Sequence, residues 1–236
     1  MHYSDRAALR QAATAPADSG LRRYVAKVYG LMGIGLSISG GVAYATSLNL
    51  SLVYVLFQST ITRFLVVFAP FILAMVLGTA IHRMSKQVAL GVFIAYAALM
   101  GLSLSSVFLV FQSGSIASIF GVSSGLFLGM GAYGYATKKD LTAFGSFLFM
   151  GLIGLIISVV VNAFLHNSLL TTILSALTVV IFTGLTAYDA QQIRLSYRLA
   201  NDETSTTRLA VIGALNLYLC FINIFLSLLR LFGARK

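Results

Sequence analysis

Long apolar stretches, separated by short polar segments, recur along almost the whole sequence. A helix needs about 20 apolar residues to cross a hydrocarbon core that is about 30 Å thick, and each stretch reaches roughly that length. The alternation over about 10 residues that is typical of a membrane β-barrel does not occur. The pattern therefore predicts an all-α membrane protein that forms a seven-helix transmembrane bundle. The seven segments are expected near residues 24–46, 62–81, 87–111, 115–136, 143–164, 169–190 and 209–231.

The composition agrees with this class of protein. Charged residues make up only 9% of the chain, whereas about a quarter of a typical soluble domain is charged. Residues 1–23 are polar and are expected to form a cytoplasmic N-terminal tail, without the apolar region of a cleavable signal peptide. Residues 24–236 are then a single seven-helix transmembrane domain. The apolar run at 52–57 is too short to cross and is expected in the first loop or at the interface.

Lysine and arginine predict the orientation of the bundle. Cytoplasmic loops are enriched in these residues, and here they occur in alternate loops, whereas the loops near 112–114 and 166 have none. The N-terminus is therefore expected in the cytoplasm. These charges are dispersed along the chain, which argues against nucleic-acid binding in spite of a net charge of +10. The basic residues of the alternate loops are Arg83, Lys86, Lys138, Lys139, Arg194, Arg198 and Arg208.

The last segment does not fit this alternation, because seven crossings would leave its basic end outside. It is either re-entrant or crosses fully within a ring of other helices, and the sequence leaves both open. Polar residues recur along it at spacings of three and four, which places them on one helical face. Such a face should meet protein or water rather than lipid, so the last helix is expected to be central. The residues are Asn216, Cys220, Asn223, Ser227 and Arg230; they either join helices by hydrogen bonds or line a pathway.

Small residues and one proline indicate how the helices pack. Gly121, Gly125 and Gly129 form a repeated small-xxx-small ladder in the fourth segment, and such ladders let helix backbones approach closely. Pro70 lies inside the second segment, where it should kink the helix or free a carbonyl group.

Asp189 is the one acidic residue expected near membrane depth, and an ionisable group there is a functional candidate. It either pairs locally, for example with Arg194, or contacts Arg83 at the same end of the second segment. The sequence has a single cysteine, Cys220, and no cluster of Cys and His with the spacing of metal ligands. No arrangement of nucleophile and base indicates catalysis. We therefore expect no enzyme activity, no resident metal and no cofactor.

Two stretches resemble the Bax inhibitor-1 family, bacterial branch. They are TAYDAQQIRLSY at 186–197 and LNLYLCFINIFLSLLRLFG at 215–233, and the KKD at 138–140 fits as well. The resemblance implies a fold in which the last helix is surrounded by the other six, and a bacterial inner membrane location. It also implies a pH-sensitive calcium leak, in which two aspartates on the last two helices share protons and an arginine of the second helix acts as a latch. Asp189 matches the first aspartate, and Arg83 is the expected latch.

The second aspartate of the family is absent. The family pattern LYLDFIN reads LYLCFIN here, with Cys220 at the acidic position. A thiol neither shares a proton with a carboxylate as a second carboxylate does nor supplies the hard oxygen ligand that calcium prefers. Three consequences are open: a leak controlled by Asp189 and Arg83 alone, a loss of selectivity or gating, or redox sensitivity at Cys220. The predicted pH-sensing and pathway residues are Asp189, Cys220, Arg83, Asn216 and Asn223.

A function of another class also agrees with the sequence. The protein would then be a regulator that does not transport ions and that binds a membrane protease or a stress-response protein through its helices or its polar tail. The expected partners are thus the lipid bilayer, calcium ions in the first interpretation, and a membrane protein in the second.

Overall fold

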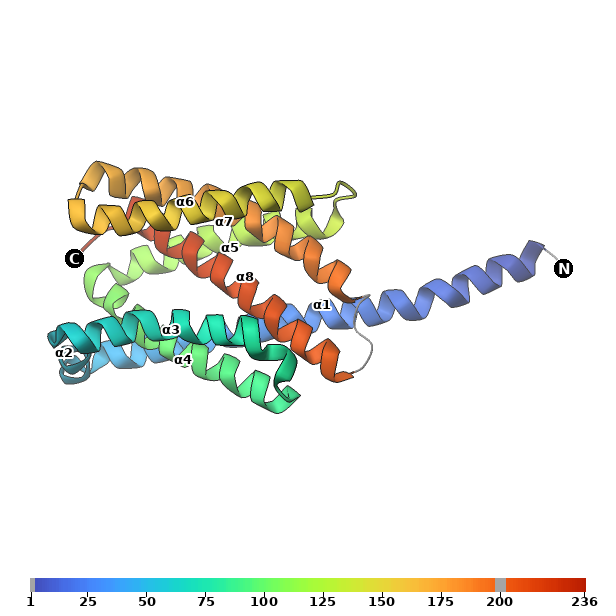
Figure 1. Ribbon diagram of the computed structural model, residues 1–236, viewed down its shortest axis with the longest axis horizontal. Coiled ribbons are helices and arrows are strands. Elements are labelled where there is room, and N and C mark those ends of the chain that lie inside the picture. Colours follow the sequence, from blue (N-terminus) through green and yellow to red (C-terminus); the bar gives the residue numbers. More distant parts are fainter. Residues whose placement is uncertain (1–2, 198–202) are drawn as a thin grey trace.

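The computed structural model describes the backbone of residues 3–197 and 203–236, and the side chains from Ser19 onward apart from residues 50, 60, 63, 67, 82 and 198–202. Every regular element within these residues is a helix (Figure 1). The helices are α1 (Tyr3–Leu48), α2 (Leu50–Gln58), α3 (Thr60–Ala80), the 3-10 turn η1 (Ile81–Arg83), α4 (Lys86–Val110), α5 (Ser113–Ala136), α6 (Thr142–Leu165), α7 (Ser168–Ser196) and α8 (Glu203–Phe232).

Each predicted apolar segment coincides with a helix, which confirms a helical membrane bundle. Among the described residues six helices are long and apolar enough to cross a membrane: α1 from Ser19 onward, α4, α5, α6, α7 and α8. The apolar part of α3, Phe64–Ala80, is shorter, so the count of seven crossings stays a prediction. The run at 52–57 lies in α2, which connects α1 to α3 at one end of the bundle.

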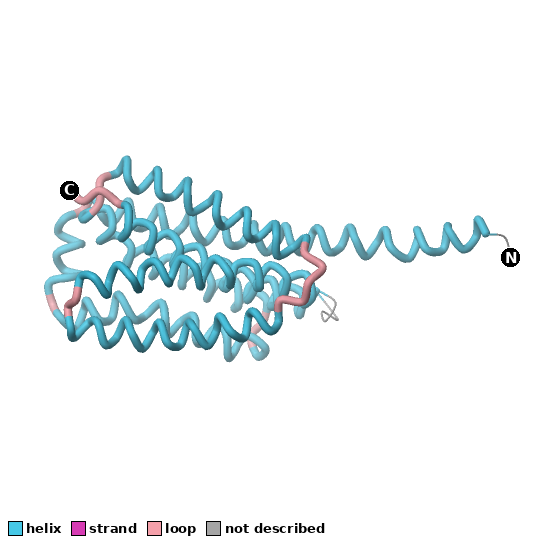
Figure 2. Tube along the Cα trace, turned by 90° about the horizontal axis from the view of Figure 1, so that it is seen from above, coloured by secondary structure: helices cyan, strands magenta, loops and turns pink. Residues whose placement is uncertain are grey.

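Helix α1 is much longer than the segment expected at 24–46. It continues without a break from Tyr3 to Leu48, across the predicted boundary between a tail and the transmembrane domain at residue 24. Its N-terminal part extends beyond the other helices (Figure 2). The predicted tail is therefore helical in its described part, while the side chains before Ser19 lie outside the described residues.

The last helix, α8, is the most buried of the long apolar helices, which agrees with its predicted central position, although one of its faces is not covered by another helix. It runs diagonally between α7 on one side and α3 on the other (Figure 1), and it packs against α1, α4, α5 and α7. Its large side chains Leu217, Tyr218, Ile224 and Leu229 are completely buried. Because lipid chains are as apolar as these side chains, the hydrophobic effect alone does not hold such helices together, and close packing with a few hydrogen bonds does.

One hydrogen-bonded chain joins α8 to α1 and α4. The hydroxyl of Tyr218 donates to Ser39 Oγ at 2.7 Å, and Ser39 donates to the carbonyl oxygen of Ala97 at 2.6 Å. Both polar side chains are buried, where no water is available to replace a lost partner. Interhelical bonds of this kind contribute about 0.6 kcal/mol each.

Helix α8 crosses the whole bundle, which decides the question that the sequence left open. At its start Glu203 pairs with Lys86 at the start of α4, with 3.2 Å between Oε1 and Nζ. At its end the chain meets the turn after α4, where Phe111 and Arg235 form an antiparallel bridge. The two helices thus begin together and end together, so α8 is a full crossing and not a re-entrant element.

Pro70 frees a carbonyl group within α3, as predicted. Proline lacks the N–H that would bond to the carbonyl of residue 66, and this carbonyl instead accepts a hydrogen bond from the hydroxyl of Ser103 on α4. The polar atom that the proline leaves unpaired therefore helps to join α3 to α4.

The predicted glycine ladder does not pack within the bundle. A Cβ atom added to Gly121, Gly125 or Gly129 would meet no atom within 4 Å, so the expectation of close helix contacts at these positions is wrong. Other glycines provide the close contacts. Gly134 on α5 lies against the backbone of Ala187 on α7, and Gly101 on α4 lies against the backbone of Ser39 on α1.

Candidate functional site

Asp189 and Cys220 face each other where α7 packs on α8. The Cys220 thiol donates a hydrogen bond to Asp189 Oδ2, with 3.4 Å between Sγ and the oxygen. Both side chains are buried, with exposed fractions of 7% for Asp189 and 3% for Cys220. The structure thus brings together two of the five predicted site residues, and it places residue 220 directly opposite the carboxylate of α7.

Small residues on α7 create this contact. Gly184, Thr186, Ala187 and Ala190 are all buried. Gly184 lies against side chains of α6, and Ala187 lies against Gly134 of α5. Helices whose interface consists of small residues approach until their backbones are close. The short side chains of Asp189 and Cys220 can therefore reach each other across the interface.

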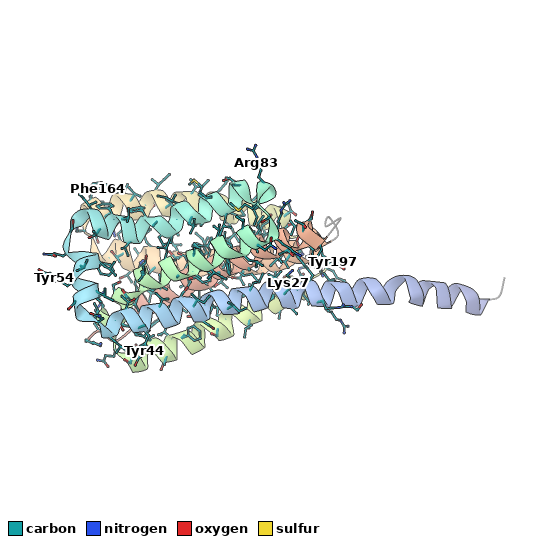
Figure 3. All side chains as sticks on the ribbon, turned by 90° about the horizontal axis from the view of Figure 1, so that it is seen from below. Lys27, Tyr44, Tyr54, Arg83, Phe164 and Tyr197 are labelled. Carbon is teal, nitrogen blue, oxygen red and sulfur yellow. The ribbon has the colours of Figure 1, made fainter. Side chains whose placement is uncertain are left out.

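Arg83 does not contact Asp189 in this structure. It lies in the turn η1 after α3, and its side chain is exposed and points away from the bundle (Figure 3). The contact was expected only if the second and sixth segments adjoin, but α3 packs mainly on α4 and α7 packs on α5, α6 and α8. The expectation of an Asp189–Arg83 contact is therefore corrected, while a role for Arg83 in gating stays a prediction.

Arg194 does not pair with Asp189 either. Its guanidinium group donates to the carbonyl oxygens of Tyr135 at 2.7 Å and of Thr137 at 3.2 Å. These carbonyls belong to the end of α5, where the last turn of a helix leaves carbonyl groups without partners and favours a positive charge. Arg194 therefore caps α5, and the local pair that the sequence left open is not formed.

Gln191 is a buried polar residue that sequence reasoning missed. Its amide nitrogen donates to the carbonyl oxygen of Lys139 at 2.7 Å, and its amide oxygen accepts from the N–H of Leu141 at 2.9 Å. Together with Arg194 it fixes the loop between α5 and α6, which carries the KKD at 138–140. The signal in the sequence was an amide side chain two residues after Asp189 in the same helix.

The carboxylate of this loop is held in its charged form. Hydrogen bonds from the side chain and the backbone N–H of Thr142 hold the pKa of Asp140 below its ordinary value. Asp140 is exposed and lies just before α6, where a negative charge is favourable at the start of a helix. The loop therefore presents two lysines and one stabilised carboxylate beside the end of α7.

Replacing Gln191 by alanine should loosen this loop. The change leaves the buried N–H of Leu141 and the carbonyl of Lys139 without their partner, which costs about 1–3 kcal/mol, so local opening becomes about tenfold more frequent or more. Trypsin cleavage after Lys138 or Lys139 of the folded protein measures this opening. Gln192→Ala is the matched control, because no hydrogen bond of the Gln192 side chain is found among the described residues. Equal cleavage rates for both variants would contradict the role of Gln191.

The residues of the predicted polar face of the last helix do not share one environment in the structure. Cys220 and Ser227 are buried, whereas Asn223 is half-buried and Asn216 and Arg230 are exposed. The amide of Asn223 donates only to the carbonyl of Leu219 in its own helix, at 2.8 Å. The five residues therefore do not act as one row: two point into the bundle and three lie on its accessible side.

The described residues contain no evident metal centre. No group of three or more His, Cys, Asp or Glu side chains that could hold a metal ion is found in the part of the chain that the structure describes. The chemistry of the site is thus that of one carboxylate, one thiol and the neighbouring amides.

Comparison with known proteins places these features in a family. The family model described as "Inhibitor of apoptosis-promoting Bax1" matches residues 21–236. A protein of Borreliella burgdorferi is 45% identical over 215 residues, which are 91% of this chain and 93% of the relative. The inner membrane protein YbhL of Escherichia coli K12 is 40% identical over 220 residues, with 92% and 94% covered. A membrane protein of Streptococcus pyogenes is 33% identical over 218 residues, with 92% and 94% covered.

Proposed function

The chain belongs to the Bax inhibitor-1 family of membrane proteins, and from this premise we propose that it is a leak protein for calcium ions whose conduction responds to pH through Asp189. The observation that carries the proposal is the buried contact between Asp189 on α7 and Cys220 on α8. It lies at the position where the family resemblance implies a pair of aspartates that share protons. Calcium is the transported ion in this proposal and not a resident cofactor.

The contact links the protonation of Asp189 to the packing of two helices. An ionised carboxylate only accepts hydrogen bonds, whereas a protonated carboxyl group also donates one. The thiol of Cys220 donates to Asp189 Oδ2 at 3.4 Å. Protonation of Asp189 weakens this hydrogen bond and adds an O–H donor that needs an acceptor of its own. Because α8 is the central helix, a change at this contact reaches the neighbours on which α8 packs.

Cys220 makes the proposed control simpler than in relatives with two aspartates. Two carboxylates in contact titrate as a coupled pair, while here a single carboxylate faces a thiol. A thiol also lacks the hard oxygen that calcium prefers. We therefore expect a pH response that rests on one carboxylate, while the role of Arg83 in gating stays a prediction.

The proposed location is the bacterial inner membrane, with the N-terminus in the cytoplasm. The name of the E. coli relative states an inner membrane location for that protein, and the apolar helices of this chain require lipid around them. The loops rich in lysine and arginine then lie in the cytoplasm, as such loops usually do.

Asp189→Asn is expected to abolish the pH dependence of calcium flux. Asparagine has nearly the same shape as aspartate but does not titrate, so it keeps the packing and removes the proton. The measurement is calcium entry into dye-loaded liposomes that contain the native protein or the variant, between about pH 5 and pH 8. The native flux should change with pH, and the variant flux should stay constant over the same range.

Asp140→Asn is the control, because this carboxylate lies in a loop and is exposed. It should retain the native pH profile. A pH profile in Asp189→Asn that matches the native one would show that Asp189 is not the sensor. If the folded native protein shows no calcium flux at any pH, the proposal that it conducts calcium is wrong.

A regulator that does not conduct ions is the second candidate, and the extended α1 favours it. This helix continues beyond the bundle as far as Tyr3, so it offers a long surface to a membrane protease or a stress-response protein. A chain that begins at Ser19 distinguishes the two functions. It should lose binding of the partner if the protein is a regulator through this segment, and it should still conduct if the protein is a leak.

A further inference from the structure

One face of α8 stays accessible along much of its length, although the helix is otherwise buried. From residue 209 to residue 230, the side chains that are not buried recur at alternating spacings of three and four, and every residue between them is buried. This is the heptad spacing by which one helix packs along another. The accessible residues, called the α8 stripe below, are Leu209, Ile212, Asn216, Leu219, Asn223, Leu226 and Arg230.

The α8 stripe lies on the side of α8 that its neighbours leave uncovered. The main partners of α8 are α7, α1, α5 and α4, and it makes little contact with α3. Figure 1 shows α8 between α7 and α3, with most of its length drawn in front of the other helices. Asn216 and Arg230 are exposed and the other five residues of the stripe are half-buried, so the stripe is partly open to whatever surrounds the protein in the membrane.

Asn216 makes this face unsuitable for lipid. It is exposed and lies near the midpoint of α8 (Glu203–Phe232), which crosses the bundle from end to end. No hydrogen bond of its side chain is found among the described residues. An amide in hydrocarbon without a hydrogen-bond partner is costly, so water or another protein should cover the stripe.

The residues around Asn216 favour a protein over water. Ile212, Leu219 and Leu226 alternate with Asn216 and Asn223 along the stripe, so that every second position is apolar. A water-filled path gains nothing from a row of apolar side chains. A row of apolar residues with an amide at some of the alternate positions is the pattern of a helix interface whose register the amides fix.

The charge of Arg230 indicates that the covering helix is not a second copy of this chain. Arg230 is exposed, and no hydrogen bond or ion pair of its side chain is found among the described residues. The chain has no Asp or Glu after Glu203, so a second α8 in the same direction would place arginine beside arginine. Like charges in contact disfavour such a pair, whereas a carboxylate on a different helix would match Arg230.

We propose that the α8 stripe is the docking site for a transmembrane helix of a different protein, which carries amide side chains opposite Asn216 and Asn223 and a carboxylate opposite Arg230. Binding at this site does not require ion conduction, so the inference stands apart from the proposed function. It gives Asn216 and Asn223 a role in recognition, which differs from the pathway role predicted from the sequence.

A synthetic transmembrane peptide tests the docking site. The peptide consists of leucine and alanine, with Asn, Asn and Asp at successive positions seven residues apart, to match positions 216, 223 and 230. Energy transfer between the labelled peptide and the labelled full-length protein in liposomes measures binding. We expect this peptide to bind about tenfold more tightly than a peptide with leucine at all three positions, because it supplies two amide contacts and one ion pair.

Exchange of charge makes the test specific. Arg230→Glu should reverse the preference, so that a peptide with lysine at the third position binds more tightly than the peptide with aspartate. Asn216→Leu should reduce the difference between the amide peptide and the leucine peptide. Arg23→Glu is the control, because Arg23 is exposed on α1 and lies outside the stripe; it should leave the preference unchanged. Equal affinity of the native protein for all three peptides would overturn the proposal.

Two further results would assign the stripe to another occupant. Energy transfer between two labelled copies of the protein that is lost in Asn216→Leu would identify a second copy. Rapid reaction of Asn216→Cys with a maleimide that does not cross membranes, measured in a Cys220→Ser background, would identify a water-filled path. Either result would overturn docking of a different helix. Slow reaction, slowed about tenfold more by the matched peptide, is the expected outcome.

Discussion

Gly134→Ala should strongly destabilise the protein and disturb the site. An added Cβ atom would overlap the backbone carbonyl of Ala187 on α7, and a backbone cannot move aside as the end of a flexible side chain can. Overpacking of this kind costs about 1–3 kcal/mol or more. Because Ala187 precedes Asp189 by two residues, the shift of α7 also changes the contact between Asp189 and Cys220. Thermal unfolding of the purified protein in detergent measures the loss, as a lower midpoint.

Gly125→Ala on the same helix is the matched control. A Cβ atom at this position meets no atom within 4 Å, so the change adds only the higher helix propensity of alanine, which is about 1 kcal/mol in favour of the helix. Its unfolding midpoint should equal or exceed that of the native protein. Equal midpoints for the two variants would show that the α5–α7 contact is not as close as described.

Cys220→Asp is expected to change the shape and the midpoint of the pH response of calcium flux. It puts a second carboxylate opposite Asp189, at a position where the native thiol lies 3.4 Å from Oδ2. Two carboxylates that interact this closely bind protons in two steps that belong to the pair. The flux–pH profile should therefore gain a second step or move its midpoint by about one pH unit or more, as measured in the same liposome assay.

Cys220→Ser separates titration from hydrogen bonding. The serine hydroxyl still donates to Asp189 and does not titrate in this range, so the native profile should persist. If the native protein does not conduct calcium and Cys220→Asp does, then the cysteine at position 220 prevents conduction in the native protein. If Cys220→Asp leaves both flux and its midpoint untouched, position 220 has no part in the response. If no variant conducts although all are folded, the regulator becomes the better proposal.

The roles around Asp189 could be predicted from the sequence only in part. The carboxylate and residue 220 were found because each is unusual within an apolar helix or departs from a family motif. Arg83 was expected beside Asp189, since both lie at one end of their segments, but α3 and α7 do not adjoin and the arginine is exposed. Gln191 and Arg194 were not assigned to the α5–α6 loop, because only the packing of α7 on α5 brings the carbonyls of that loop within reach.

The sequence by itself determined the class of protein, the position of each apolar segment and the central place of the last helix. These depend on the local pattern alone, because a long apolar segment in lipid must satisfy its backbone hydrogen bonds within itself and therefore forms a helix. The tertiary structure decided which faces meet. The ladder at Gly121, Gly125 and Gly129 faces open space while Gly134 packs against α7, and one polar row on α8 divides between the bundle and its surface. The physical reason is that the lipid-facing and the buried helix faces are both mainly apolar, so hydrophobicity does not distinguish them and close packing does.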